Sequence, residues 1–265
     1  MDNTIYKNRR NNLQKLLPEN SVLLIPGADI QFRNADSAYA FRQDSSFYYF
    51  SGFCEPFSLI AIVKNKDGIC SIAFVQPKDK LKEIWDGHRA GPIGAVDEYL
   101  FDKAYDNSQI DKIMPDILNG CSQVLYSIGK KVGFDQKVID WTTDASSKDR
   151  HSKSINIIDA SSLIGNARLI KDEHEINLMR KACDISAEAH IEAMKSVKSI
   201  SSEQEIESMY IHEFSKRGGR FQAYTPIVAG GENACILHYV ENNQKLQGSD
   251  LLLVDAGCEY EMYAS

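Results

Sequence analysis

One stretch of the sequence constrains the fold more than any other, because its pattern is that of a single long helix. From Asp172 to Lys198 the chain contains neither glycine nor proline. Residues at helical spacing along it are Ile176, Met179, Cys183, Ala187, His190, Met194 and Val197. This spacing predicts one amphipathic helix with these residues on its buried face.

A second helix is predicted directly after the first. Ser202 and Glu205 have the form of a capping box, and Gly218 with Gly219 predicts the helix end. The expected buried face carries Ile206, Met209, Tyr210 and Phe214. Beyond this helix, the apolar runs YTPIVAGG, ILHYV and LLLVDAGCEYEMY predict strands of an antiparallel sheet lined by helices.

The sequence before about residue 166 has a different character. Residues 4–17 and 109–119 predict helices, the second of which contains Pro115. The β-rich runs, separated by turn residues, are SVLLIPG, FYYFSGF, SLIAIV, SIAFVQ, SQVLYSIG and KVGFD. Strands that alternate with helices predict an α/β domain with a mixed sheet. We place the domain boundary so that residues 1–165 and 166–265 form separate domains.

Charge and hydropathy exclude several classes of protein. The chain has 37 acidic and 30 basic residues, with no long block of either sign, which argues against a nucleic-acid partner. No run approaches the roughly 18 apolar residues of a membrane span, and no apolar stretch at the amino terminus fits a signal peptide. The six cysteines are spread singly, as in proteins with reduced thiols. We therefore expect a cytoplasmic protein with no nucleic-acid and no membrane partner.

Asp255 is the most informative polar residue, because it follows four apolar residues and precedes Ala-Gly. An ionised carboxylate at the end of a buried strand is costly unless it is paired or bound to a cation. On local grounds a hydrogen-bonded turn aspartate is favoured over a metal ligand, since a divalent ion needs several oxygen or nitrogen ligands.

His238 and a Gly-Gly turn are the other local candidates. His238 lies in CILHYV, where a core or edge histidine is favoured over a hydrogen-bond donor beside a developing oxyanion. Gly230 and Gly231, followed by Asn233, fit a simple hairpin, and they lack the Gly-Lys-Ser/Thr ending of a phosphate loop. Local patterns therefore predict an α/β protein with a candidate carboxylate and histidine site.

The order of the longer motifs takes the interpretation further. The motifs are, in chain order, RNADSAYAFRQDSSFYYFSGF, EIWDGHRAG, RLIKDEHEINLMRKACDISAEAH, HEFSKRGGRFQAYTPIVAGGENACILHYVEN and SDLLLVDAGCEYEMYA. In these motifs the chain resembles the creatinase/prolidase/aminopeptidase P metallopeptidase family, over roughly residues 5–265. The first-domain motifs favour the Xaa-Pro aminopeptidase (aminopeptidase P) branch over prolidase and creatinase.

The resemblance implies a fold and an activity. The implied class is α/β followed by α+β: an N-terminal mixed-sheet α/β domain at 1–165 and then the first part of a pita-bread fold at 166–265. The implied reaction releases an N-terminal residue that precedes proline, so the partners are peptides with proline at the second position. The family uses two manganese ions per complete site and forms homo-oligomers, either dimers or tetramers. Proline lacks an N–H and its ring fixes φ, so a site shaped for the ring can discriminate by fit.

The resemblance also assigns roles to single residues. Asp255 matches the first metal-ligating aspartate, and His238 matches a histidine that binds or polarises the substrate. Tyr224 matches a pocket tyrosine. Asp36 and Trp85 match residues that help to complete active sites in tetrameric relatives, where the tryptophan comes from a neighbouring subunit. Asp36 fits a turn cap equally well, and Trp85 fits an ordinary surface or core aromatic.

The remaining ligands of the family are a second aspartate, a histidine and two glutamates, and none has a counterpart up to Ser265. A single carboxylate should bind a hard divalent cation only weakly. We therefore expect a chain that lacks most metal ligands, as a truncated or frameshifted gene or a fragment would, and that is inactive alone. The alternative is a non-catalytic oligomerisation or peptide-binding fragment.

Overall fold

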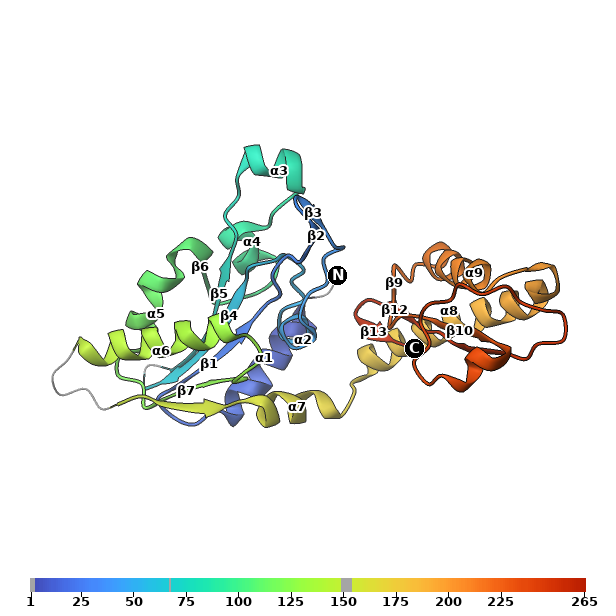
Figure 1. The fold of residues 1–265 in the computed structure, drawn as a ribbon. Helices are drawn as coiled ribbons and strands as arrows, with labels where there is room; N and C mark the ends of the chain where they lie inside the picture. Colours follow the sequence, from blue (N-terminus) through green and yellow to red (C-terminus); the bar gives the residue numbers. More distant parts are fainter. Residues whose placement is uncertain (1–2, 67, 149–153) are drawn as a thin grey trace. The chain divides into compact units, whose positions relative to one another are not determined.

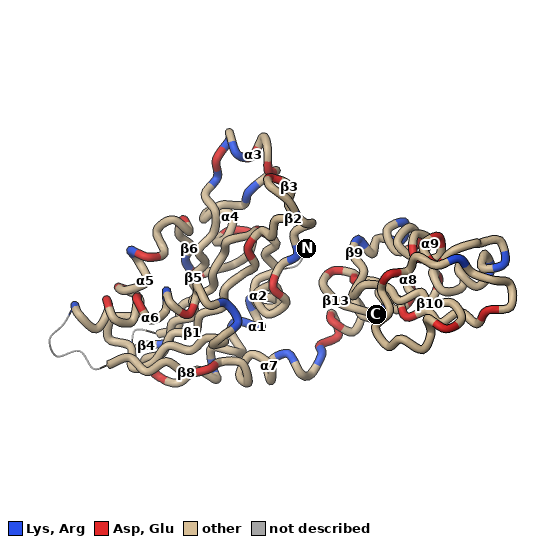
Figure 2. The backbone as a smooth tube through the Cα atoms, viewed as in Figure 1, with Lys and Arg blue, Asp and Glu red and all other residues tan. Residues whose placement is uncertain are grey.

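The computed structural model describes residues 3–66, 68–148 and 154–265, which fall into two units, 1–169 and 170–265 (Figure 1). Basic and acidic residues are interspersed along the backbone of both units (Figure 2). Among the helices of the described residues, none has the length and apolar character needed to cross a bilayer.

A six-stranded mixed sheet forms the centre of the first unit (Figure 1). Its strand order is β6-β5-β4-β1-β7-β8, and β1 runs antiparallel to β4 but parallel to β7. The strands are β1 Ser21–Pro26, β4 Leu59–Asn65, β5 Gly68–Val75, β6 Lys103–Asp106, β7 Gln123–Tyr126 and β8 Asn156–Asp159. The mixed sheet with its flanking helices confirms the predicted class of this domain.

Helices pack on both faces of this sheet. Leu23 and Ile25 of β1 face a hydrophobic cluster with α1, α2, α4 and α7, whereas Val22 and Leu24 face a second cluster with α5 and α6. The alternation follows from the strand pleat, which sends successive side chains to opposite faces. The helices are α1 Thr4–Leu16, α2 Ser45–Ser51, α4 Gly91–Asp97, α5 Ile110–Leu118, α6 Val132–Ser147 and α7 Ser161–Leu169. The remaining elements are β2 Phe32–Asn34, β3 Ser37–Ala38, α3 Lys80–Asp86 and the 3-10 turn η1 Asn107–Gln109.

The run FYYFSGF, predicted as a strand, is the helix α2. Its start is set by Asp44, whose carboxylate accepts hydrogen bonds from the amides of Ser46 and Phe47 at 2.8 and 2.9 Å. Its end is set by Gly52, which adopts φ +67° and donates its amide to the carbonyl of Tyr48 at 2.7 Å. A fully buried apolar run has the same pattern in a strand and in a helix, so here the two caps decide.

The run KVGFD, also predicted as a strand, is the start of α6. Asp135 in the first turn accepts the amide of Gly129 at 3.2 Å, which closes the turn before the helix. The Phe134 ring packs edge-on against Tyr126 of β7 at a centroid distance of 5.7 Å. It packs in the same way against Trp141, about two helical turns further along α6, at 5.8 Å. Helical spacing of these aromatic rings explains the difference from the prediction.

Two long helices and two small antiparallel sheets make up the second unit. Its elements are α8 Glu173–Ser196, η2 Val197–Ser199, α9 Glu203–Lys216, β9 Phe221–Gln222, β10 Ile227–Gly230, η3 Gly231–Cys235, β11 Leu252–Asp255, β12 Cys258–Tyr260 and β13 Tyr263–Ala264. One sheet pairs β10 with β11, and the other has the order β13-β12-β9. Both predicted helices are confirmed. The hydroxyl of Ser202 accepts the amide of Glu205 at 3.2 Å, which is one half of the predicted capping box, whereas the carboxylate of Glu205 accepts the amide of Ser201 at 2.8 Å.

The buried face of α8 differs from the predicted one. Met194 is 68% exposed and Met179 is 37% exposed. The buried residues are instead mainly small: Glu175, Ala182, Ile185, Ser186, Ala189 and Ala193. Small side chains let β12 approach closely, so that Cys258 places its amide 3.0 Å from the hydroxyl of Ser186. The packed face of this helix is therefore formed by Ile185 and mainly small residues of a hydrophobic cluster, and not by its methionines.

Candidate functional site

The structure brings Asp255 and Tyr224 together. Asp255 ends β11 opposite Ile227 of β10, and its side chain is exposed. The phenol of Tyr224 donates a 2.5 Å hydrogen bond to Oδ1 of Asp255. Partial burial and the adjacent carboxylate raise the pKa of Tyr224 to about 12, so the phenol stays protonated and acts as the donor.

At Gly257, the glycine of Asp-Ala-Gly, a larger residue would clash with its neighbours. A Cβ at this position would lie 2.7 Å from Oγ of Ser265 and 3.3 Å from the phenol oxygen of Tyr224. The carbonyl of Gly257 also accepts the amide of Ala223 at 2.9 Å. Glycine therefore lets the turn after Asp255 approach the segment that carries Tyr224.

His190, which was predicted only as part of the buried face of α8, contacts the turn that follows Asp255. Nε2 of His190 lies 3.1 Å from the carbonyl of Ala256, and Nδ1 lies 2.7 Å from the phenol of Tyr210. A carbonyl can only accept, so Nε2 carries the proton and, in the neutral ring, Nδ1 accepts from Tyr210. Burial raises the pKa of Tyr210 to about 12, which keeps this phenol a donor. The chain Tyr210–His190–Ala256 fixes the residue that follows Asp255.

His238 does not lie on a strand, contrary to the prediction for ILHYV. It occupies an exposed turn after η3, between Leu237, which is 90% exposed, and Tyr239, which is 5% exposed. Only Tyr239 of this run turns inward, where its phenol donates to Glu203 at 2.7 Å. One buried anchor with exposed neighbours fits a turn, because a strand would bury alternate residues.

Asp36 and Trp85 both belong to the first unit. Asp36 is exposed in the turn between β2 and β3. Trp85 is 86% exposed on α3. Their roles in a site with Tyr224, His238 and Asp255 stay predictions.

Glu203 bonds the segment that contains His238, and sequence patterns did not single it out. It is fully buried at the first position of α9, and its carboxylate accepts hydrogen bonds from four groups. Burial alone would raise its pKa, but these hydrogen bonds hold the pKa of Glu203 below its ordinary value. The only local signal is an acidic residue in the first turn of a helix, where most glutamates are solvated.

A divalent ion requires more ligands than these residues supply. Asp255 supplies one carboxylate, whereas hard divalent ions take about six oxygen or nitrogen ligands. Across residues 3–66, 68–148 and 154–265, no group of three or more His, Cys, Asp or Glu side chains is close enough to hold a metal ion. These described residues therefore do not by themselves fit a dinuclear metal centre.

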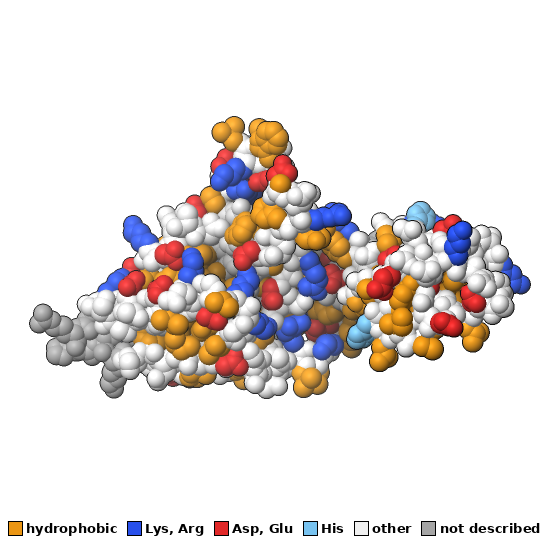
Figure 3. Space-filling model, viewed as in Figure 1, with side chains coloured by type: hydrophobic (Ala, Val, Ile, Leu, Met, Phe, Trp, Pro, Cys, Tyr) orange, Lys and Arg blue, Asp and Glu red, His pale blue; other side chains and the backbone are white. Residues whose placement is uncertain are grey.

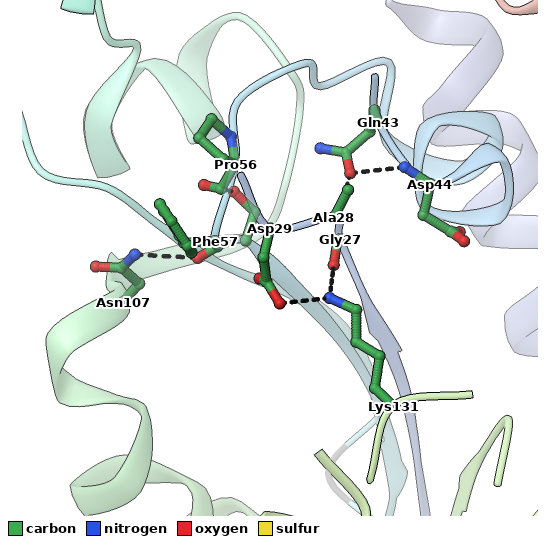
Figure 4. A network of polar contacts seen from close by, with 10 residues as sticks. Gly27, Ala28, Asp29, Gln43, Asp44, Pro56, Phe57, Asn107 and Lys131 are labelled. Carbon is green, nitrogen blue, oxygen red and sulfur yellow. Dashed lines mark hydrogen bonds and ion pairs between the residues drawn. The ribbon is translucent and has the colours of Figure 1, made fainter. Parts of the chain in front are cut away.

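The first unit contains a separate polar network beside a cavity of about 470 Å³. Nζ of Lys131 donates to the carbonyl of Gly27 at 2.6 Å and pairs with Asp29 at 3.0 Å (Figure 4). Phe57 and Trp141 contribute aromatic walls to the cavity. None of the residues predicted as site residues lines it.

Two protein-family descriptions match the chain. Residues 6–126 match "Aminopeptidase P, N-terminal domain", and residues 177–265 match "Metallopeptidase family M24". The first match falls within the unit with the six-stranded sheet, and the second contains α9, β11 and Asp255.

Whole-chain comparisons agree with these matches. The Xaa-Pro aminopeptidases of Haemophilus influenzae and Escherichia coli are 38% and 34% identical, over 98% of this chain and over 58% and 59% of their own lengths. Among solved structures, Pseudomonas aeruginosa aminopeptidase PepP and a zinc-substituted E. coli aminopeptidase P in complex with product both match with a TM-score of 0.94, at 36% and 33% identity. Each match covers 100% of this chain, and 60% and 61% of the two solved chains. The chain therefore spans about 60% of the length of these four proteins.

Proposed function

This chain belongs to the aminopeptidase P family of M24 metallopeptidases, and on that premise we propose that it contributes to the removal of an N-terminal residue that precedes proline. The observation that carries the proposal is the pair of Asp255 and Tyr224 at the end of β11, joined by a 2.5 Å hydrogen bond. A carboxylate presented at a strand end, with a neutral phenol to orient it, suits the first ligand of a metal site.

Each residue has a proposed role. Asp255 would supply one oxygen ligand to a divalent ion, and manganese is the ion we propose. Tyr224 would orient that carboxylate, and His238, exposed on its turn, would contact the substrate carbonyl. Peptides with proline at the second position are the proposed substrates, because the fixed proline ring allows selection by shape. Asp255 would be one metal ligand, and a dinuclear site would need further ligands from outside the described residues.

The test begins with the polypeptide of residues 1–265 alone. With manganese and an Arg-Pro-Pro peptide it should release no arginine above background, because one carboxylate cannot hold the ions that activate water. Fused to the part of the H. influenzae relative that the match does not cover, the same polypeptide should release arginine, and EDTA should abolish the release. The measurement is free arginine by chromatography.

Two variants of the fusion make this test specific. Asp255→Asn should reduce arginine release to background, since it removes a charged ligand at nearly constant volume. Asp250→Asn is the matched control, because Asp250 is an exposed carboxylate that accepts the amide of Gln247 at 2.9 Å, and it should leave the rate unchanged. Cleavage by residues 1–265 alone would contradict the need for further metal ligands, and a well-folded fusion with intact Asp255 that does not cleave would contradict the proposed function.

One feature favours a second candidate function, self-association through α3. No residue of α3 is buried, and Leu81, Ile84 and Trp85 are 75%, 76% and 86% exposed. Their spacing puts them on one face of the helix. Figure 3 shows hydrophobic side chains at the top of the view, where Figure 1 places α3. A cluster of large exposed apolar side chains typically marks an interaction site. We propose a homo-oligomer, dimer or tetramer, in which Trp85 reaches a neighbouring subunit.

Replacing both Leu81 and Trp85 with serine should shift the protein toward the monomer. The pair supplies much of the apolar area on α3, and losing it should weaken self-association at least about tenfold. The measurement is sedimentation velocity over a concentration series. Val132→Ser is the control, because Val132 is 82% exposed on another helix of the same unit. A wild-type chain that remains monomeric at every concentration would rule the interface out.

A further inference from the structure

The segment that carries His238 joins β10 to β11 and has little regular structure. After η3 it has turns and no helix or strand, apart from one isolated bridge between Ser202 and Lys245. A connection of this kind needs side chains to fix its path, because its backbone groups have few partners in a sheet or helix. We define residues 230–244, which begin at the last residue of β10, as the His238 loop.

A single carboxylate collects donors from along this loop. Oε1 of Glu203 accepts the amide of Gly230 at 2.8 Å and the side-chain amide of Asn233 at 2.9 Å. Oε2 accepts the phenol of Tyr239 at 2.7 Å and the amide of Gln244 at 2.9 Å. The backbone amide of Glu203 also donates to the carbonyl of Gln244 at 3.0 Å. The loop is thus held at both ends and in the middle.

The contact with Tyr239 reaches next to His238. Tyr239 is 5% exposed, whereas Leu237 and Val240 are 90% and 47% exposed. The phenol bond to Glu203 therefore ties the loop to the interior next to His238. Asn242, which is 1% exposed, ties it a second time, accepting the amide of Val228 and donating to the carbonyl of Pro226, both at 2.9 Å. Because His238 directly precedes Tyr239, the orientation of its backbone depends on it.

The surroundings of Glu203 favour an ionised carboxylate. Its side chain is fully buried, and burial alone would raise its pKa, but the four hydrogen bonds hold the pKa below its ordinary value. Its place in the first turn of α9 also favours a negative charge, because the helix N-terminus is the positive end of the dipole. An ionised carboxylate has four lone-pair positions for acceptance, which matches the four donors from the loop.

We propose that Glu203 is the positioning residue of the His238 loop. Its carboxylate fixes the loop from β10 to Gln244, and through Tyr239 it sets where His238 is presented. The link to catalysis rests on the proposed function, in which His238 contacts the substrate. Groups at such sites have to be held within a fraction of an ångström by supporting hydrogen bonds, and Glu203 provides that support here.

Glu203→Gln tests the proposal at almost constant volume. Glutamine keeps one accepting oxygen and turns an NH₂ toward donors, so at least two of the four contacts are lost. Amide exchange across 231–244 should accelerate at least about tenfold, and the His238 ring resonance should shift or broaden. Exchange in 206–216 and 258–260 should change little. Glu205→Gln is the matched control, since Glu205 lies in the same turn but is exposed and bonds Ser201.

A milder variant covers the case in which Glu203→Gln does not fold. Tyr239→Phe retains the buried ring and removes only the contact nearest His238, so faster exchange should be confined to residues 236–242 and the His238 resonance should move. Unchanged exchange and resonance in a folded variant, or equal acceleration throughout the second unit, would overturn the proposal. These readouts do not use peptidase activity, so a failed turnover assay and a failed positioning role are distinguishable.

Discussion

Replacing Arg10 with methionine should destabilise the first unit by about 3–5 kcal/mol. Arg10 is 1% exposed, and its guanidinium donates to the carbonyls of Phe50, Tyr99 and Leu100 at 2.8, 2.9 and 2.8 Å. It also lies 4.0 Å from the ring centre of Phe101. Burial lowers the pKa of Arg10 to about 10, which leaves it charged at neutral pH. Methionine fills much of the volume but leaves three carbonyls without a donor.

Urea unfolding monitored by tryptophan fluorescence would measure this effect. Arg33→Met is the matched control, because it makes the same change of charge at an exposed position of β2 and should cost less than about 0.5 kcal/mol. Arg10→Lys should fall between the two, since one ammonium group cannot span three carbonyls in the geometry of a guanidinium. A loss below about 1 kcal/mol for Arg10→Met would show that the hydrogen bonds from Arg10 to the three carbonyls contribute little to stability.

Gly52→Ala should cost about 3 kcal/mol, a large effect for a single methyl group. Gly52 has φ +67°, where a Cβ is strained by about 1–2 kcal/mol. The new methyl would also lie 2.4 and 2.6 Å from carbons of the Tyr6 ring, which is 2% exposed and has little room to move. Both the backbone strain and the overlap with the ring act at the junction of α1 and α2.

A second glycine separates these two contributions. Gly120 has φ +79°, but a Cβ there would meet no atom within 4 Å. Gly120→Ala should therefore cost only the backbone strain, about 1–2 kcal/mol. The difference between the two variants in urea unfolding measures the contact with Tyr6. Equal losses at both positions would show that the ring moves aside freely.

Short-range patterns predict the sheet of the first unit well. SVLLIPG and SLIAIV become β1 and β4, which pair along their whole length from Ser21 opposite Lys64 to Pro26 opposite Leu59. Continuous apolar runs bounded by turn residues fit strands that are covered on both faces, as β1 is by its two hydrophobic clusters. The predicted mixed sheet is therefore confirmed.

The errors have a common physical cause. FYYFSGF, KVGFD and ILHYV have strand-like composition, but distant or flanking groups decide their conformation. Asp44 and Gly52 cap the first run as a helix, and the phenol of Tyr239 draws the third into a turn on Glu203. Composition cannot report a hydrogen bond to a residue 36 positions away.

The candidate site was only partly predictable for the same reason. Asp255 was singled out by its place after an apolar run and Tyr224 through motif resemblance, and the register of β10 and β11 brings them into contact. His190 and Glu203 were missed as supporting groups, because a histidine on a helix face and a first-turn glutamate have ordinary local patterns. Their importance comes from Ala256 and from the His238 loop, which lie far along the chain.

Both tryptophans of the chain lie in the first unit, and their surroundings are opposite. Trp141 is 3% exposed with its indole N–H on Asp111 at 3.0 Å, while Trp85 stands 86% exposed on α3. Intrinsic emission therefore combines a shielded, blue-shifted component with a red-shifted one that is open to iodide quenching. The second unit contributes no indole, so tryptophan fluorescence does not report its unfolding. Tyrosine absorbance or circular dichroism has to be used for that unit.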